Sequence, residues 1–399
     1  MTTVEQRQID LLDGYLYAGD PDPTYTWLRD HAPVYRDETN GIWAVSRYHD
    51  VLDCEKNTAL YSSAHGSRPN LEDSTSMINM DDPRHQRQRQ LVARQFTPRA
   101  VKDIEDRVRS VVTGLIDEVC ETGCCDVVHD LAAPLPAAII AEKLGFPSDT
   151  WPRVVYWSET TMLSGGGPRY LGVAAMKAVQ DFAATAMAVI AERRREPCDD
   201  LISVWCHKPV DGRAMSDAEI LSEALLLLDG GAETTRTVIG STVLALIDHP
   251  EQRQALLEDP ELLADTAVEE FIRWVTPILN MRRTATQDHE LHGQPIRAGD
   301  QVLLMYGSAN RDPAAFPDPQ RFDVTRRHNQ HVAFGFGTHF CLGAALARLE
   351  IRVMFDELLR RVPDMRLAPW ADPQRQPSAF ACGLKDLRVE FTPSPRATA

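Results

Sequence analysis

The stretch Phe334-Gly335-Phe336-Gly337-Thr338-His339-Phe340-Cys341-Leu342-Gly343 places a cysteine at the end of a loop that glycines interrupt. An amphipathic helix is predicted directly after it, because apolar residues between Leu342 and Val353 fall on one face. The backbone amides of this turn and helix start are expected to point at the sulfur of Cys341, where they stabilise a thiolate that can bind a metal. Gly335, Gly337 and Gly343 leave room for a flat ring system close to the backbone.

Cys341 is best explained as the axial ligand of a haem iron. His339, two residues earlier, offers a hydrogen-bond donor to an anionic group at the rim of such a ring. A thiolate ligand pushes electron density onto haem iron, which favours cleavage of the O–O bond. The alternative is a buried free cysteine in a glycine-rich turn, which the length of the pattern disfavours. The sequence therefore predicts haem b, iron protoporphyrin IX, held by Cys341.

Four further segments support this interpretation by their content and their order along the chain. They are His85-Gln86-Arg87-Gln88-Arg89, Gly230-Gly231-Ala232-Glu233-Thr234-Thr235, Glu270-Phe271-Ile272-Arg273, and Asn310-Arg311-Asp312-Pro313 with Pro319-Gln320-Arg321-Phe322. Together with the cysteine loop they resemble the cytochrome P450 family nearly from end to end. The resemblance implies a mainly α fold with small β regions, a triangular helical domain around a buried haem. It is strongest to soluble actinobacterial enzymes that oxidise cholesterol side chains and methyl-branched lipids.

The bulk properties fit such an enzyme. The 399 residues contain no Gly/Ser linker, low-complexity run or repeat, so we predict a single domain over residues 1–399. A formal net charge of −16 argues against nucleic-acid binding. Eight scattered cysteines without a C-x-x-C pair indicate free thiols in a reducing cytosol. The polar start of the chain and the lack of a long apolar run predict no signal peptide and no membrane span, hence a cytoplasmic protein.

Local patterns predict the elements around these motifs. We expect two small β regions, about 31–65 and 288–306, and a buried helix that begins at the capping box Ser216-Asp217-Ala218-Glu219 and ends near His249-Pro250. Helices are also expected over 149–163 and on to about Arg195. Between them, Ser164-Gly165-Gly166-Gly167-Pro168 is interpreted as the hinge of a lid, with an ordinary surface turn as the alternative.

The resemblance also implies catalytic roles on the long helix. Thr234 would hydrogen-bond dioxygen, Glu233 would relay protons from solvent, and Gly230 with Gly231 would mark a local opening of the helix. Glycine inside a helix costs about 0.5–1 kcal/mol, so these two need a reason. The alternatives are a Thr234 hydroxyl bonded to a preceding carbonyl, and an ordinary salt bridge for Glu233.

The remaining site residues are assigned by the same resemblance. The haem propionates would be bound by His85, Arg89, Arg283 and His339, while Phe334 and Gly335 would lie next to the sulfur. Arginine suits this role because it binds carboxylates through two nitrogens. Glu270, Arg273 and Arg321 are predicted to form a structural ion network behind the haem loop.

The substrate pocket is predicted from separated segments. Its wall would consist of Leu226, Asp229, Gly230, Leu279, Met281, Phe380 and Ala381, with residues 66–80 as its roof. Asp229 departs from the family pattern, which has an apolar residue at this position. A carboxylate there needs a partner. We favour pairing with an Arg or Lys of the lid helices. The alternative is that Asp229 accepts a hydrogen bond from a hydroxyl or amine of the substrate.

The function predicted from these features is a monooxygenase that inserts one oxygen atom of dioxygen into an unactivated C–H bond of a small apolar molecule. A sterol or branched lipid is the first choice, while macrolide, terpene and aromatic substrates stay open. The chain after Cys341 is too short for a reductase domain, so a monomer served by a ferredoxin and its reductase is expected. They would dock near Arg348, Arg352, Arg107 and Arg109. Alternatives are a peroxygenase, which the Glu233-Thr234 pair disfavours, and a haem-thiolate sensor or carrier.

Overall fold

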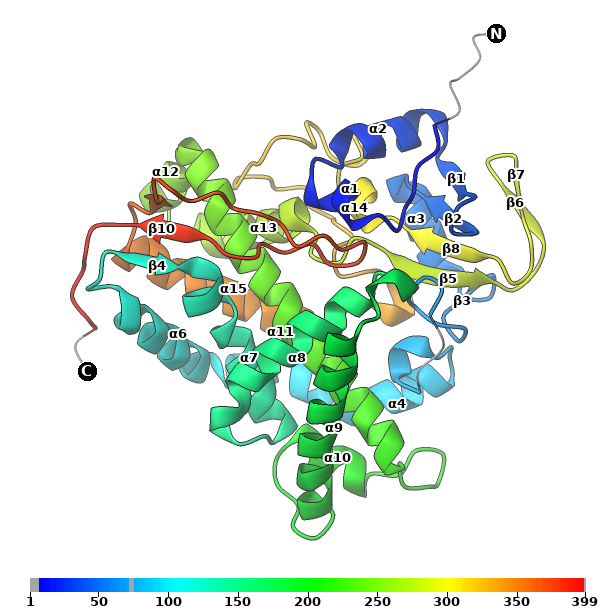
Figure 1. Cartoon of the computed structure of the whole chain (residues 1–399), viewed down its shortest axis with the longest axis horizontal. Helices are drawn as coiled ribbons and strands as arrows, with labels where there is room; N and C mark the ends of the chain where they lie inside the picture. The colour runs from blue at the N-terminus through cyan, green and yellow to red at the C-terminus, as the bar shows by residue number, and fades with distance from the viewer. Residues whose placement is uncertain (1–6, 72–74, 398–399) are drawn as a thin grey trace.

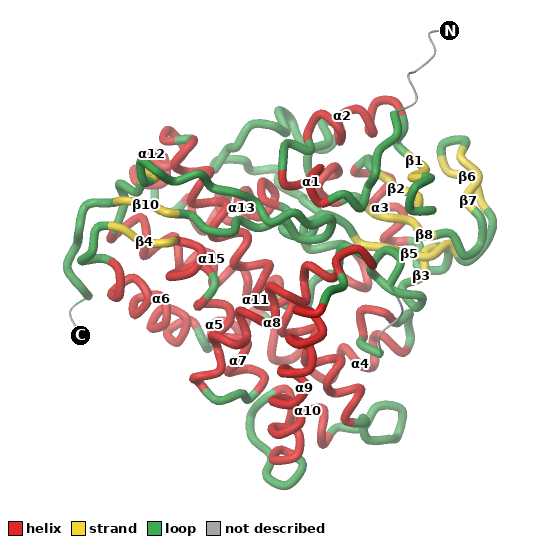
Figure 2. Tube along the Cα trace, in the orientation of Figure 1, coloured by secondary structure: helices red, strands yellow, loops and turns green. Residues whose placement is uncertain are grey.

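A computed structural model describes residues 7–71 and 75–397 of the chain. The body has a triangular outline in which helices fill most of the area, most strands gather at one corner, and a smaller group of strands lies on the opposite side (Figures 1 and 2). Helices make up 53% of the structure and the sheets are small, which confirms the predicted fold class.

The helices occupy both sides of the longest one, α11. They are α1 (Gly14–Ala18), α2 (Asp22–His31), α3 (Tyr48–Lys56), α4 (Arg84–Val92), α5 (Pro98–Lys102), α6 (Glu105–Val119), α7 (Pro134–Leu144), α8 (Trp151–Ser164), α9 (Val173–Arg193), α10 (Leu201–His207), α11 (Asp217–Asp248), α12 (Pro250–Glu258), α13 (Val268–Val275), α14 (Tyr306–Ala309) and α15 (Ala344–Arg361). The main hydrophobic core surrounds α11 and includes buried residues of α6, α7, α8 and α15.

The strands form three sheets. The largest has the order β1-β2-β8-β5-β3, the second has the order β4-β10-β9, and β6 pairs with β7. Their bounds are β1 (Val34–Asp37), β2 (Ile42–Val45), β3 (Tyr61–Ser62), β4 (Cys124–Asp126), β5 (Met281–Ala285), β6 (His289–Leu291), β7 (Gln294–Ile296), β8 (Gln301–Leu304), β9 (Arg366–Leu367) and β10 (Arg388–Glu390). The two predicted β regions meet where β2 pairs in parallel with β8. Strand β5 was missed because two arginines interrupt its apolar pattern.

The capping box at the start of α11 is formed as predicted. The Ser216 side chain accepts a hydrogen bond from the Glu219 backbone, and the Glu219 side chain accepts one from the Ser216 backbone. From there α11 runs without interruption through the middle of the molecule, in contact with α7, α8, α9, α13 and α15 (Figure 1). The expected opening of the helix at Gly230 is therefore absent from α11 as the structure describes it.

The glycines between α8 and α9 are buried. A Cβ atom added at Gly165 would lie 2.6 Å from Cδ1 of Phe380, and one at Gly166 would lie 2.8 Å from the ring of Tyr170. Gly167 has a φ of +112°, a backbone conformation that other residues rarely adopt. An ordinary surface turn is therefore the wrong interpretation, since close packing requires these glycines. Movement of this segment as a lid stays a prediction.

Gly165→Ala should destabilise the protein. The added methyl group must displace Phe380 or the backbone of α8, and such overpacking costs about 1–3 kcal/mol. Gly172→Ala is the matched control, because nothing lies within 4 Å of a Cβ atom at that position. Thermal unfolding of both haem-loaded variants measures the difference. Equal midpoints for the two variants would mean that close packing does not explain Gly165.

The sequence analysis predicted no segment that could span a membrane, but helix α9 has the length and composition of one. Among the described residues it is the one helix with the length and composition of a span, with a mean hydropathy of 1.4 over its most apolar window. Only 33% of that window is buried, yet α9 also packs against α8, α10 and α11. The apolar residues of α9 are thus divided between the protein core and its outer face.

Candidate active site

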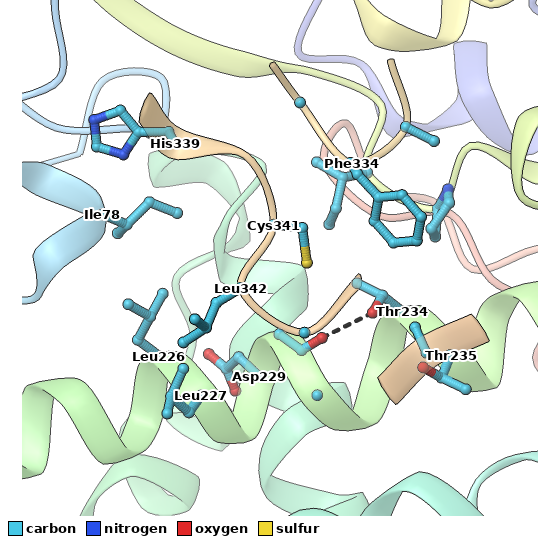
Figure 3. A pocket seen from close by; sticks show the side chains of 18 of the residues that line it. Ile78, Leu226, Leu227, Asp229, Thr234, Thr235, Phe334, His339, Cys341 and Leu342 are labelled. Atoms are coloured by element: carbon cyan, nitrogen blue, oxygen red, sulfur yellow. Dashed lines mark hydrogen bonds between the residues drawn. The ribbon is translucent and has the colours of Figure 1, made fainter. Parts of the chain in front are cut away.

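A cavity of about 240 Å³ lies between α11 and the loop that precedes α15 (Figure 3). It is enclosed by segments that are far apart in the sequence, including the loop after β3, α4, α8, α11, β5 and the start of α15. The predicted site residues that line it are His85, Arg89, Leu226, Asp229, Gly230, Thr234, Met281, Arg283, Phe334, Gly335, His339 and Cys341. The fold therefore brings most of the predicted site together.

The cysteine loop is closed by its own backbone. The Cys341 N–H donates to the carbonyl of Phe334 at 2.9 Å, so the loop returns to its starting point. Gly335 and Gly337 have φ values of +68° and +69°, in the left-handed region that favours glycine. The loop directs the sulfur of Cys341 toward α11, where Thr234 lies on the opposite side of the cavity (Figure 3).

The surroundings of the sulfur act on it in opposite directions. Burial raises the pKa of the Cys341 thiol, whereas the Gly343 N–H and the charge of Arg89 lower it. Beside the sulfur, the guanidinium of Arg348 lies 4.6 Å from the ring centre of Phe334. An N–H donor and nearby cations are what a thiolate needs in order to persist as a metal ligand.

Four basic groups gather at one edge of the cavity. The rings of His85 and His339 are 4.1 Å apart, and Arg89 donates to the Phe340 carbonyl at 2.6 Å. Burial, and then the charges of Arg283, His85 and Arg89, lower the pKa of His339 to about 3. This edge presents the N–H donors of two arginines and two histidines, which suit an anionic ligand.

Glu55 and Tyr306 complete this edge, and the sequence interpretation missed both. Glu55 is buried, accepts a hydrogen bond from Arg283 at 2.7 Å and receives a second one from the Tyr306 hydroxyl. Glu55 thereby fixes the guanidinium of Arg283 beside the cavity. No local pattern marks a glutamate near the end of a short helix as part of a site, so only the fold reveals it.

A haem group fits these residues. A Cβ atom added at Gly230 or at Gly343 would meet nothing within 4 Å, so both glycines face open space on opposite sides of the cavity. Cys341 would bind the iron between them. The basic edge would bind the two propionates through the N–H donors of its arginines and histidines.

Gly231 and Thr234 also have structural roles within and around α11, besides the catalytic roles predicted for this part of the helix. A Cβ atom at Gly231 would come within 3.0 Å of Ile140, so this glycine permits the close approach of α7 to α11. The Thr234 hydroxyl donates to the Gly230 carbonyl at 2.8 Å, as the alternative interpretation expected. In this orientation the hydroxyl oxygen offers its lone pairs to the cavity.

Glu233 lies outside the main cavity. It accepts a hydrogen bond from Arg236 at 2.9 Å, and both side chains are buried. It faces a second, much smaller cavity that Glu159 and Gln376 also line. Burial raises the pKa of Glu233. The salt bridge that was the alternative interpretation is thus present, and a relay from Glu233 would have to break it.

Three residues predicted for the pocket wall, Leu279, Phe380 and Ala381, do not line the cavity. The Leu279 N–H donates to the Phe380 carbonyl at 2.9 Å and the Leu279 side chain is buried, whereas the neighbouring Ile278 lines the cavity. Phe380 is fully buried behind the wall, and Ala381 lines the small cavity beside Glu233. Cavity residues that the sequence interpretation missed include Met162, Leu227 and Ile278.

The roof of the cavity comes in part from the segment 66–80, as predicted. Arg68, Met77 and Ile78 line the cavity, whereas residues 72–74 lie outside the described part of the chain. The buried carboxylate of Glu223 holds this segment to α11 by accepting the Met77 N–H at 2.6 Å. Burial raises the pKa of Glu223 to about 7.

Behind the cysteine loop, Glu270 and Arg273 form the predicted ion pair. Their atoms approach to 2.7 Å and both side chains have no exposed surface. The third side chain of the network is Arg326, which lies 3.2 Å from Glu270. The prediction of Arg321 was wrong for the side chain, which is exposed, although its carbonyl accepts from Arg273. The arginine five residues later reaches back because the intervening chain turns.

Comparison with known proteins identifies this arrangement. A family model described as cytochrome P450 matches residues 171–363. The sequence is 44% identical to a steroid C26-monooxygenase of Mycolicibacterium smegmatis over 97% of this chain and 96% of that protein. The chain belongs to the cytochrome P450 family. This P450 is also 41% identical to a methyl-branched lipid omega-hydroxylase of Mycobacterium bovis, with 93% of this chain and 91% of that one covered.

Solved P450 structures agree with the fold. A Mycobacterium marinum cytochrome P450 in complex with pseudoionone matches with a TM-score of 0.88 and 34% identity, covering 97% of this chain and all of that one. A Bacillus megaterium P450 in complex with testosterone matches with a TM-score of 0.87 and 34% identity over 94% of this chain and 98% of that one. The predicted cofactor, haem b with a cysteine thiolate, and the predicted class, a monooxygenase that hydroxylates an apolar substrate, are confirmed.

Proposed function

We propose that this P450 hydroxylates an unactivated C–H bond of a steroid or a methyl-branched lipid. The observation that carries the proposal is the single cavity in which the Cys341 sulfur, the Thr234 hydroxyl and an apolar wall of Leu226, Met162 and Ile278 meet. The names of the relatives support this substrate class. Natural products of the macrolide, terpene or aromatic kind are the second choice.

The side chains around the cofactor would have different roles. Cys341, His85, Arg89, Arg283 and His339 would hold the haem, which would supply the activation of dioxygen when bound. Leucine and isoleucine side chains of the wall hold the substrate and exclude water, which limits side reactions. Thr234 then supplies a proton toward dioxygen, and for this its hydroxyl must rotate away from the Gly230 carbonyl.

Glu233 would replace the proton that Thr234 gives up. Its carboxylate is paired with Arg236, and Glu159, which is 41% exposed at its side chain, lies 3.5 Å from the same arginine. Arg236 can therefore exchange one carboxylate for the other, which frees Glu233 to turn and take up a proton from the side of the small cavity.

Electrons would come from a ferredoxin and its reductase, as separate proteins in the cytoplasm, to a single-domain monomer. The four arginines expected at the docking face are already paired with acids of this chain. Arg348 pairs with Glu269, Arg352 and Arg109 pair with Glu105, and Arg107 pairs with Glu142. A partner would meet a mixed surface there, so we expect its docking to depend only weakly on salt.

Turnover with ferredoxin, reductase and NADPH tests the proposal. A panel of sterols, branched fatty acids and macrolides is first screened by the change in the haem spectrum, and binders are then incubated with the electron donors. An oxygenated product that requires the donors supports a monooxygenase. Product formed with hydrogen peroxide alone would indicate a peroxygenase, and binding without product would indicate a carrier or sensor.

Thr234→Ala should separate electron use from product formation. The variant keeps the apolar cavity and binds substrate, but without the hydroxyl most of the consumed dioxygen should leave as peroxide. Product and peroxide formed per NADPH oxidised are the measurements. Thr234→Ser, which keeps the hydroxyl, should retain most of the product yield. An unchanged yield in Thr234→Ala would remove Thr234 from the proton path.

A further inference from the structure

Two opposite charges line the cavity, and one of them, Arg68, lies near enough to the basic edge to be influenced by the charge of Arg283. Asp229 projects from α11, and Arg68 comes from the segment after β3. The residues around them are mostly apolar, including Leu226, Met162 and Ile278. A charged side chain in an apolar wall is destabilising unless it has a hydrogen-bond or ion-pair partner. The partners of Asp229 and Arg68 therefore decide what the two groups can bind.

Asp229 has one hydrogen-bond partner among the described residues. The Thr161 hydroxyl of α8 donates to Oδ1 of Asp229 at 2.6 Å. The expected Arg or Lys of the lid helices is absent there, so the predicted ion pair was wrong for the described part of the chain. Burial raises the pKa of Asp229 to about 7, although the Thr161 hydroxyl and the charge of Arg68 lower it. The second oxygen of Asp229 stays available to a ligand.

Arg68 is held in place by contacts that use few of its N–H donors. Its Nη1 lies 3.2 Å from the Ser67 hydroxyl and 3.0 Å from the sulfur of Met281, and its guanidinium lies 3.8 Å from the ring centre of Phe380. No carboxylate of the described residues forms an ion pair with it. Burial lowers the pKa of Arg68 to about 10, so it remains charged at neutral pH. Its five N–H donors are thus mostly unused.

The two groups influence one another without touching. The charge of each affects the pKa of the other, yet they do not form a salt bridge. When Asp229 is ionised, which requires a pH above its raised pKa, a ligand group placed between them must accept from Arg68 and donate to Asp229. A carboxylate would be repelled by Asp229, an ammonium by Arg68, and a ketone can satisfy only Arg68. A neutral hydroxyl satisfies both.

We propose that Arg68 and Asp229 form a polar clamp that binds a hydroxyl group of an otherwise apolar substrate. The inference rests on the proposed function and narrows its substrate class to alcohols. Asp229 lies five residues before Thr234, which is about 7.5 Å along a helix axis. A hydroxyl bound there would lie near the reacting carbon, so oxidation a few bonds from the hydroxyl would give a diol.

The clamp also predicts which end of a lipid faces the haem. A substrate oxidised at a remote apolar terminus would place hydrocarbon against Asp229 and Arg68 and leave both charges without a partner. A sterol or branched lipid that already carries a hydroxyl on the part near the oxidised carbon avoids this cost. Such a substrate is the product of an earlier hydroxylation or of a carbonyl reduction.

Binding of three probes to the haem-loaded protein tests the clamp. Cyclododecane, cyclododecanone and cyclododecanol share one skeleton, and their dissociation constants are measured by calorimetry. We expect cyclododecanol to bind about 10-fold or more tightly than the ketone, as a hydrogen bond to a charged group predicts. Asp229→Leu should remove this preference, and Arg68→Met should weaken the alcohol and the ketone but leave the alkane unchanged.

Two variants keep the test decisive if the first ones misfold. Asp229→Asn and Arg68→Lys keep the shape of the wall, and each should reduce the alcohol preference. Equal affinities of wild-type protein for alcohol and ketone would overturn the clamp. An Arg68→Met variant that loses haem but keeps the alcohol preference would also overturn it, because Arg68 would then hold the cofactor. The proposed function is tested by other measurements, namely the thiolate spectrum and product formation. The dissociation constants of the three probes test the clamp even if no product is formed.

Discussion

Cys341→His should abolish the long-wavelength absorption band that carbon monoxide gives with reduced, thiolate-bound haem. Of the eight cysteines in the sequence, Cys341 is the one among the lining residues of the cavity. Imidazole can still bind the iron, so the variant is expected to retain haem and to show the spectrum of a histidine-ligated protein. Loss of the thiolate should also remove monooxygenase turnover, since its electron donation favours O–O cleavage.

The matched control for this variant is another cysteine. Cys198→Ser changes an exposed thiol and Cys382→Ala changes a buried one, and neither lines the cavity. Both variants should keep the band at full height per haem. A band that survives in Cys341→His, or that disappears in Cys382→Ala, would assign the iron ligand to a different cysteine.

The predictable parts of this fold are those whose cause is local. A capping box fixes the start of α11 through bonds between residues three apart. Ile42–Val45 is a short apolar run after the turn signal Asn40-Gly41, so β2 lies inside the predicted β region of about 31–65. The cysteine loop is equally local, because its glycines meet the backbone requirements of the loop itself. Such features can be derived from the sequence without knowing what packs against them.

The parts that could not be predicted depend on partners far away in the sequence. Whether Leu279 or Ile278 faces the cavity is decided by the pairing of that segment with the chain near Phe380. Glu55 enters the site because Arg283 lies beside it, 228 residues later. Asp229 finds Thr161, and the Arg68 guanidinium rests on Phe380. Family resemblance placed the segments correctly, but it did not decide which side chain of each segment faces the cavity.

The pair Glu270–Arg273 shows how much stability a non-local network can hold. Arg273 binds both oxygens of Glu270 at 2.7 and 2.8 Å and donates to the carbonyls of Asn310 and Pro319 at 2.9 and 3.0 Å. Glu270 also accepts the N–H of Asp323 at 2.9 Å. One helix is thereby connected to the long irregular segment that leads to the cysteine loop.

Glu270→Ala should therefore lower the free energy of unfolding by about 3–5 kcal/mol, because it leaves the charge of Arg273 buried without its partner. The haem loop should loosen at the same time, so thermal unfolding and the rate of haem loss are both measured. Arg321→Ala is the control and should change stability by less than about 0.5 kcal/mol, since that side chain is exposed.

Arg326→Ala, which removes a guanidinium from the network, should destabilise the protein by an amount between those of Arg321→Ala and Glu270→Ala. If Arg321→Ala were as damaging as Glu270→Ala, the side chain of Arg321 would belong to the network after all. The double variant Glu270→Leu/Arg273→Met should recover part of the loss, because replacing both charges with apolar groups removes the need for compensation.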